Sequence, residues 1–448
     1  MAAVPESPLR RLLRGAQLRG AAANFGWLLA DRVLRLGLGL FVMVLVARHL
    51  GPSDYGVLAY AGALVASFGG VVSLGLDALV VRDLVRTSER AGEILGTAFA
   101  LRLGGAVASI AGAIAVVVCL KRDDSVAIEL VVILSCTNLF LAADAIDLWL
   151  QSRVLGRTAV IARSVPLLLM ATVRVMLALT DSPVHAFAVA TAVESGLAAG
   201  GLVVAYRWRG ERFRCWTASR KYAATLAREG WPLFLAVAMV AGRIRLEQIL
   251  LGQMAGYEPV AQFAVASRVV DFWTVVPMTV MVSLFPAIVR ARERGSGEYL
   301  VNLQRLYDGL VWAAILFATA VWLAGPRVVV WLFSVRYAPA AEVLTILVWS
   351  SIWISFALAR GRWLVAEGRT RDALMVEGAV LVVGIAANLV LIPAYGALGA
   401  AFANLISLLL GNLLVAGVSA PIRLSFAMLG RSLILPLRLL SANADRMP

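Results

Sequence analysis

The apolar run from Ala21 to Ala47 constrains this chain more than any other stretch of its sequence. A helix needs about 20 residues to cross the hydrocarbon core of a bilayer, and this run is longer. It breaks between Arg48 and Gly56, and a second apolar run follows directly. The two runs therefore predict a transmembrane helical hairpin, and a related hairpin is expected at residues 230–270.

The composition of the whole chain agrees with a membrane protein. Hydrophobic residues make up 61% of the 448 residues and charged residues only 15%, whereas soluble domains carry about 25% charged residues. The mean hydropathy is +0.86. The three cysteines have neither paired spacing nor neighbouring histidines, so we expect no disulfide framework and no metal site.

Apolar runs bounded by charged or turn residues predict twelve membrane spans. The predicted fold is an all-α polytopic membrane protein with two six-helix bundles. The spans are expected near residues 22–47, 56–81, 94–118, 126–148, 160–180, 185–206, 230–251, 260–285, 307–324, 341–359, 373–393 and 398–419.

The distribution of basic residues predicts the orientation in the membrane. Of the 41 Lys and Arg residues, 28 fall in segments on the side of the N-terminus, 5 in the opposite loops and 8 within the spans. Because cytoplasmic loops carry the excess of Lys and Arg, both termini are predicted to be cytoplasmic. The same bias accounts for most of the +14 net charge, so nucleic-acid binding is not needed to explain it.

The chain divides into five predicted parts. The longest cytoplasmic connection lies almost at the middle of the sequence, as expected for a linker between two lobes. The parts are a basic arm (1–21), an N-terminal six-helix lobe (22–206), a linker (207–229), a C-terminal six-helix lobe (230–419) and a cytoplasmic tail (420–448).

The eight arginines within the spans demand a polar environment. An arginine at the centre of a bilayer costs roughly 3 kcal/mol, and eight facing lipid would exceed the stability of a typical fold. They should therefore face protein or water. They are Arg32, Arg35, Arg102, Arg163, Arg174, Arg243, Arg245 and Arg268.

Some of these arginines have a carboxylate at a spacing of three or four residues, which places the two side chains on one helix face. Such a pair either serves only to neutralise its own charges or belongs to a functional site, and the spacing leaves both readings open. The pairs are Asp31 with Arg35, Arg243 with Glu247, and Arg268 with Asp271.

Arg32 and Arg245 have no same-helix partner of this kind, and with Arg163 and Arg174 they are stronger candidates to bind an anionic ligand. Among the carboxylates, Asp144 and Asp147 lie near the cytoplasmic interface, where a solvated helix end is expected. Buried carboxylates are candidates to bind a coupling ion, a proton or Na⁺. These are Glu194, Glu247, Glu377 and Asp271.

Four segments carry a family resemblance. They are ARHLGPSDYGVLAYAGALV (47–65), LGLDALVVRDLVR (74–86), LEQILLGQMAGYEPVAQFAVASRV (246–269) and WLFSVRYAPAAEVLTIL (331–347). In this order, and in this relation to twelve spans, they resemble the Wzx-type polysaccharide flippases of the multidrug, oligosaccharidyl-lipid and polysaccharide exporter superfamily. One departure is Glu247, which stands where many relatives have Asp.

The resemblance implies two six-helix bundles around a central cavity that opens to alternate sides. It implies transport of undecaprenyl-pyrophosphate-linked oligosaccharide across the bacterial inner membrane, without a cofactor. Membrane lipids, a glycan polymerase and glycosyltransferases would be partners. Arginine forks suit pyrophosphate oxygens, so the expected head-group ligands are Arg32, Arg35, Arg163, Arg174, Arg243, Arg245 and Arg268.

Three alternatives remain at this stage. A drug:cation antiporter of the same superfamily would need an acidic site. A membrane glycan polymerase or ligase would need a sizeable outer loop, and the longest predicted one, 325–340, has about 16 residues. A passive partner of a glycan-synthesis complex would not need eight intramembrane arginines. No phosphate-binding loop, HExxH motif or Ser-His-Asp order is found, so an enzyme is not expected.

Overall fold

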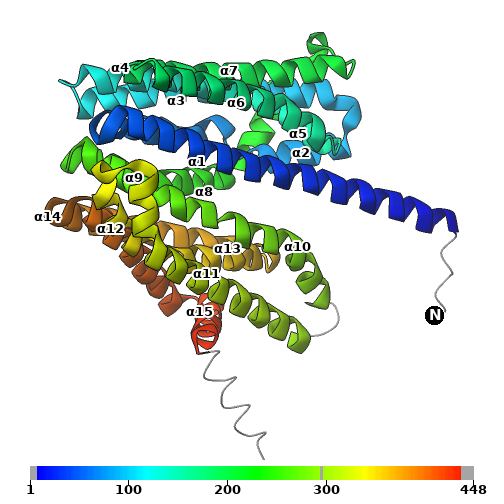
Figure 1. Cartoon of the computed structure of the whole chain (residues 1–448). Coiled ribbons are helices and arrows are strands. Elements are labelled where there is room, and N and C mark those ends of the chain that lie inside the picture. The colour runs from blue at the N-terminus through cyan, green and yellow to red at the C-terminus, as the bar shows by residue number, and fades with distance from the viewer. Residues whose placement is uncertain (1–7, 293–295, 435–448) are drawn as a thin grey trace, which may run out of the picture. The chain divides into compact units, whose positions relative to one another are not determined.

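The computed structural model describes residues 8–292 and 296–434, and these fold into helices without any strand (Figure 1). They form two compact units. The first contains the chain up to His49 and Leu64–Ala238, and the second contains Leu50–Ala63 and the chain from Met239 onward. The ends of the predicted basic arm (residues 1–7) and cytoplasmic tail (residues 435–448) lie outside the described residues.

The first helix, α1 (Pro8–Ser73), breaks where the sequence predicts a break. Gly51 has a φ of 74° inside α1, and Pro52 follows it. A positive φ is readily adopted only by glycine, and proline has no N–H to continue the helical hydrogen bonds. The limb that follows, residues 52–63, belongs to the second unit.

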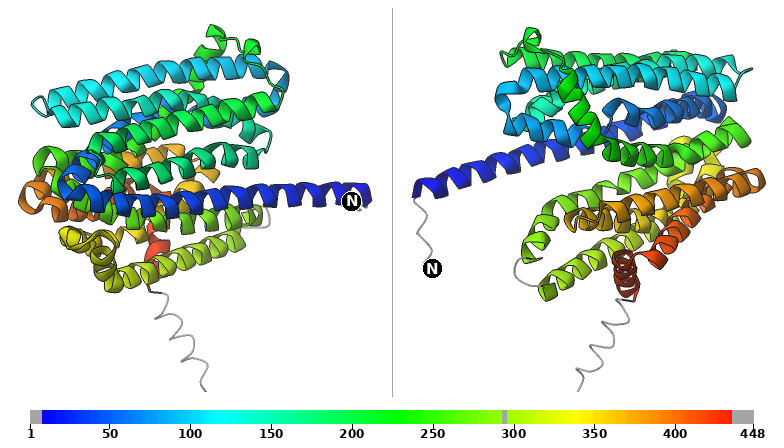
Figure 2. Two further views of the ribbon diagram at one scale, coloured as in Figure 1. Left: turned by 45° about the horizontal axis from the view of Figure 1, so that its top comes forward. Right: turned by 180° about the vertical axis from the view of Figure 1, so that it is seen from behind.

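The remaining helices of the first unit run to the end of the predicted N-terminal lobe. α6 packs on α7, α7 on α4, and α4 on α3, and these four helices stay side by side in both views of Figure 2. The elements are α2 (Asp77–Arg86), α3 (Ala91–Leu120), α4 (Ser125–Phe140), α5 (Asp144–Ser152), α6 (Gly156–Leu179) and α7 (Val184–Trp208).

The core of the first unit lies where α2, α3, α5 and α7 meet. Trp149, Tyr206 and Trp216 stack edge to face, with ring centroids 5.1 Å and 5.7 Å apart for the two pairs that Tyr206 makes. Leu95 and Leu150 are fully buried beside them. Trp216 belongs to the predicted linker, so part of the linker is built into this core.

Further contacts hold the linker against the first unit. Thr217 N–H donates to the carbonyl of Gly92 (3.3 Å), and the Tyr222 hydroxyl donates to Asp83 (2.8 Å). Burial and the hydrogen bond to Asp83 raise the pKa of Tyr222, so it remains a neutral donor at physiological pH. The unit boundary falls beyond the linker, at Ala238 inside α8 (Arg220–Met254).

The second unit is built on α11 and α14. Its core contains Tyr307, Phe356 and Val380, all buried. α14 breaks at Gly396, which has a φ of 54° and follows Pro393. The helices are α9 (Tyr257–Trp273), α10 (Val275–Arg292), α11 (Ser296–Phe333), α12 (Ala338–Leu347), α13 (Ser350–Ala366), α14 (Thr370–Val418) and α15 (Ala420–Leu433).

The α1 limb that belongs to the second unit packs closely on α8 and α9. A side chain at Gly56 would meet the carbonyl oxygen of Tyr257 at 2.0 Å, so only glycine fits there. Tyr60 is fully buried, and its hydroxyl accepts a hydrogen bond from Gln253 (2.5 Å). The close approach of the two helices therefore depends on a residue without a Cβ at position 56.

Among the described residues, 8 helices are long and apolar enough to cross a membrane, or up to 9 if the bent α12–α13 pair is one span. Two of the helical stretches, Ala30–Arg86 and Thr370–Val418, contain the breaks at Gly51 and Gly396, and each is long enough for two crossings. With these second limbs and the 35-residue, more highly charged α8, the segments correspond to the twelve predicted spans.

Large apolar side chains cover the outside of these helices. Leu169, Val107 and Val390 are 54, 59 and 71% exposed, and only 22–39% of the most apolar window of each span is buried. Such continuous apolar surface is unsuited to water and suited to lipid. The chain is therefore an all-α, multi-pass membrane protein.

Candidate functional site

The charged residues of the first span lie on α1 and meet α6. The Arg35 Nε lies 2.9 Å from the Asp31 carboxylate, which confirms the pair predicted from their spacing. Ser164 also donates to Asp31 (2.8 Å). Arg32, next to this pair, is exposed and has neither a hydrogen bond nor an ion pair with any residue that the structure describes.

Arg163 on α6 binds two carboxylates of α5. Its Nη2 lies 2.8 Å from Asp144 and 3.2 Å from Asp147. The sequence favoured a solvated helix end for both aspartates, and that prediction is wrong, because Asp147 is only 14% exposed and both aspartates form ion pairs with Arg163. Arg102 on α3 forms a second ion pair nearby, with Asp77. These groups act electrostatically on Asp144 as one network.

Arg174, further along α6, also has a carboxylate partner. Its Nη1 donates to Glu194 on α7 (2.6 Å), and its Nη2 donates to the Thr191 hydroxyl (3.2 Å). Both charged side chains are mostly buried, with 12 and 22% exposed. Arg174 and Glu194 thus neutralise each other across the α6–α7 contact.

In the second unit, the partner of Arg243 differs from the predicted one. Arg243 on α8 donates to Glu377 on α14 (3.0 Å), not to Glu247 one turn along its own helix. Glu247 is 4% exposed and accepts a hydrogen bond from Asn404 (2.9 Å). The adjacent helix α14 therefore supplies the partners of both Arg243 and Glu247. The predicted pair between Arg243 and Glu247 on one helix is wrong.

Arg245 and Arg268 lie near Asp271 without an ion pair. Both arginines act electrostatically on Asp271, and all three side chains are half-buried. No hydrogen bond or ion pair joins them within the part of the chain that the structure describes. Arg268 and Asp271, the third predicted same-helix pair, thus lie close to each other but do not form an ion pair.

Comparisons with known proteins place this arrangement in a family. Residues 21–292 match the family model described as polysaccharide biosynthesis protein. The chain belongs to this family. Three of the four segments that carry the predicted resemblance lie inside the matched region, which confirms it. No curated protein sequence matches the chain.

Solved structures show the same fold. A multidrug resistance MATE family transporter of the MOP superfamily, inward-facing, superposes with a TM-score of 0.71 at 16% identity, covering 86% of this chain and 94% of that one. The lipid II flippase MurJ, inward closed, gives 0.68 at 15% identity, covering 92% of each chain. An outward-facing MATE transporter gives 0.60 at 14% identity, covering 90 and 96%. At these identities the likeness concerns the fold.

The sequence analysis misplaced Arg360, a buried charge of this polysaccharide biosynthesis protein. Arg360 was counted in a cytoplasmic loop, because the span was predicted to end at residue 359. It lies inside α13 and is 3% exposed. It donates to Asn412 and stands over the Phe356 ring at 4.9 Å. The apolar residues from Trp363 to Ala366 were the signal that the helix continues.

The eight arginines predicted to lie within the spans of this family member thus fall into two groups. Five have a carboxylate bound to them: Arg35, Arg102, Arg163, Arg174 and Arg243. Three have none among the described residues: Arg32, Arg245 and Arg268. The second group is the one that can bind an anion without first breaking an ion pair. The described residues contain no group of three or more His, Cys, Asp or Glu that could hold a metal ion.

Proposed function

We propose that the chain is a flippase that translocates an oligosaccharide linked to a lipid through pyrophosphate. On this proposal it carries undecaprenyl-pyrophosphate-linked oligosaccharide from the cytoplasmic to the outer leaflet of a bacterial inner membrane by alternating access. Its family is named for polysaccharide biosynthesis, and one structure of the same fold is a lipid II flippase. Both support a lipid-linked saccharide as the substrate. Glycosyltransferases and a glycan polymerase are the expected partners.

The observation that carries the proposal is the set of three arginines without a carboxylate. Keeping an arginine within a span without a bonded carboxylate costs free energy, so Arg32, Arg245 and Arg268 are poorly explained by packing alone. Pyrophosphate offers oxygens that match the planar guanidinium fork, and each charge-assisted hydrogen bond contributes about 1.5–3 kcal/mol. In this proposal the five paired arginines keep the helices in place and contribute to binding only through the field around them.

We further propose that Glu247 and Asp271 bind the coupling ion, a proton or Na⁺. Glu194 and Glu377, the other predicted candidates, are each bound to an arginine. Glu247 is bound instead to a neutral amide, and Asp271 has no bonded cation among the described residues. A buried carboxylate without a bonded cation is the group that can accept a proton or metal ion without releasing a partner.

A cation-coupled drug exporter is the second candidate function. The likeness to MATE transporters and the buried Glu247 favour it. The two proposals differ in the sign of charge that contacts the cargo. A cationic drug would depend on Glu247 and Asp271, whereas a pyrophosphate would depend on the arginines.

The proposal is tested by replacing unpaired arginines and measuring surface glycan at matched protein levels in the membrane. Arg32→Ala and Arg245→Ala should each reduce surface glycan at least tenfold, because a lost charge-assisted hydrogen bond of about 1.5 kcal/mol corresponds to a factor of ten. Lys at either position should retain more transport than Ala, since Lys keeps the charge and loses only the fork.

Arg86→Ala serves as the control, because Arg86 is an exposed arginine at the end of α2. It should leave surface glycan unchanged. Normal export by both Arg32→Ala and Arg245→Ala, at equal abundance, would show that these arginines do not bind the head group. If the variants lose drug resistance but retain surface glycan, the result would favour the cation-coupled drug exporter.

A further inference from the structure

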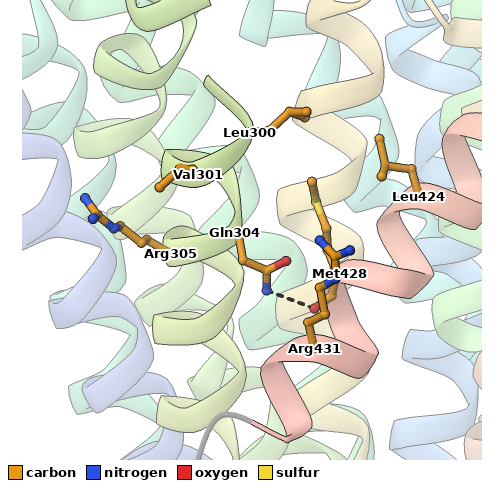
Figure 3. Close-up of a pocket in the computed structure, with 7 residues that line it drawn as sticks. All are labelled: Leu300, Val301, Gln304, Arg305, Leu424, Met428 and Arg431. Carbon is orange, nitrogen blue, oxygen red and sulfur yellow. Dashed lines mark hydrogen bonds between the residues drawn. The ribbon is translucent and has the colours of Figure 1, made fainter. Parts of the chain in front are cut away.

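A groove between α11 and α15 of the second unit has the chemistry of a lipid site, separate from the charged residues described above. Figure 3 shows it between the first turns of α11 and the length of α15. Its volume is about 300 Å³. The lining residues are Leu300, Val301, Gln304, Arg305, Leu424, Met428 and Arg431.

The groove has fixed walls. Trp312 of α11 donates to the Ser432 carbonyl of α15 (2.9 Å), and Ser432 donates to Asp308 (2.6 Å). Gln304 Nε2 donates to the Met428 carbonyl (3.0 Å), the bond drawn in Figure 3. α15 is therefore held on α11 along its last two turns, and the groove is present before any ligand arrives.

The apolar part of the groove is open to its surroundings. Leu300 and Leu424 are each 38% exposed, and Val301 is 50% exposed. In Figure 3, Leu300 and Leu424 lie at one end of the groove, across from each other. Apolar side chains that are partly exposed on two facing helices suit an acyl chain better than water.

The α15 wall of the groove carries a basic side chain. In Figure 3, the Arg431 side chain rises along this wall toward Met428, whereas the Arg305 side chain points away from α15, on the other side of α11. Arg431 is exposed and has no carboxylate partner among residues 8–292 and 296–434. The predicted topology places it on the cytoplasmic side, where anionic lipids concentrate. Arg431 is therefore suited to a phosphate.

An unpartnered acceptor lies on the α11 wall of the groove. Within the part of the chain that the structure describes, Gln304 Oε1 is buried without a hydrogen-bond partner. Its amide nitrogen already faces three acceptors, on Asp308, Met428 and Ser432. Because the nitrogen must therefore point to those atoms, the oxygen faces away from them and is left to accept from a ligand. A hydroxyl is the simplest donor that a lipid head group offers.

We propose that this groove binds an anionic phospholipid with a hydroxyl-bearing head group, of the phosphatidylglycerol kind. Its phosphate lies against Arg431, its glycerol hydroxyl donates to Gln304, and an acyl chain lies along Leu300 and Leu424. The charge of Arg431 and the unpartnered oxygen select this lipid over a zwitterionic one. The lipid is a resident of the second unit, whatever cargo the protein transports.

The test uses the purified full-length protein in nanodiscs or detergent, with phosphatidylglycerol and phosphatidylcholine of identical acyl chains. Phosphatidylglycerol should remain bound in native mass spectrometry and raise the thermal midpoint, and phosphatidylcholine should not. Arg431→Gln should weaken phosphatidylglycerol binding about fivefold, since it removes the basic contact with the anionic lipid.

Arg423→Gln is the matched control, because Arg423 is an exposed arginine of α15 that does not line the groove. It should bind phosphatidylglycerol as the unaltered protein does. The thermal midpoints of all variants without added lipid should agree, which excludes loss of α15 as the cause.

Three outcomes would overturn the proposal. One is equal retention of the two lipids, and another is full retention of phosphatidylglycerol by the Arg431→Gln variant. The third is equal stabilisation by sodium pyrophosphate alone, which would mean that the acyl chain contributes nothing.

Discussion

Arg243→Gln is expected to destabilise the second unit through Glu377 and not through Glu247. The structure joins Arg243 to Glu377 across α8 and α14 at 3.0 Å, with 23 and 28% of the two side chains exposed. Glu247, at the i+4 position on the same helix, is bound to Asn404 instead. Removing the arginine therefore leaves the Glu377 carboxylate without its cation.

The magnitude follows from the burial of the pair. Exposed ion pairs contribute about 0.2–1 kcal/mol, and breaking a fully buried pair costs about 3–5 kcal/mol. At roughly one quarter exposed, the Arg243–Glu377 pair lies between these limits, at about 2 kcal/mol. The single substitution Arg243→Gln should lower the thermal midpoint, and a second substitution that removes the abandoned charge should restore most of the loss.

A double-mutant cycle measures the interaction between Arg243 and Glu377. Arg243→Gln/Glu377→Gln should be more stable than Arg243→Gln, whereas Arg243→Gln/Glu247→Gln should show no such recovery. Thermal unfolding of purified protein in one detergent, read by intrinsic tryptophan fluorescence, compares the variants at equal lipid content. Recovery with Glu247→Gln and none with Glu377→Gln would refute the pairing across helices and favour the pair on α8.

Two further predictions concern the linker and the orientation. Gly96→Val should destabilise the protein by about 1–3 kcal/mol in the same unfolding assay, because a Cβ at residue 96 would lie 2.7 Å from the Thr217 backbone. Gly104→Val on the same helix is the control. A Cβ there meets nothing within 4 Å, so this variant should be destabilised less. Cys119 and Cys215 are both exposed, so a membrane-impermeant maleimide should label Cys119 on intact spheroplasts and Cys215 only after permeabilisation.

Each of these predictions has a result that contradicts it. Equal stability of the Gly96→Val and Gly104→Val variants would mean that the linker does not pack on α3. Labelling of Cys215 from outside would reverse the predicted orientation, and with it the cytoplasmic placement of the linker.

The class of the protein and the places where its helices break could be predicted from the sequence. A segment in lipid must satisfy its backbone hydrogen bonds within itself, so a run of apolar residues carries the information for a span locally. Gly51 with Pro52 marks the break in α1 because the local backbone requires it. For the same reason the Asp31–Arg35 pair, one turn apart on one helix, was correctly predicted.

The partners of the other charges were decided only by the tertiary structure. Arg243 is separated from Glu377 by 134 positions in the sequence, and Arg102 from Asp77 by 25. At such separations, sequence spacing does not predict whether two side chains meet. Which carboxylate pairs with an arginine depends on the helix faces that pack against each other. An ion pair at i,i+4 stabilises a helix only slightly, so it does not prevent pairing with a carboxylate of a neighbouring helix. Arg360 was placed outside the span because a charged residue usually marks the end of a span. That rule fails here because Asn412 lies inside the fold and accepts a hydrogen bond from Arg360.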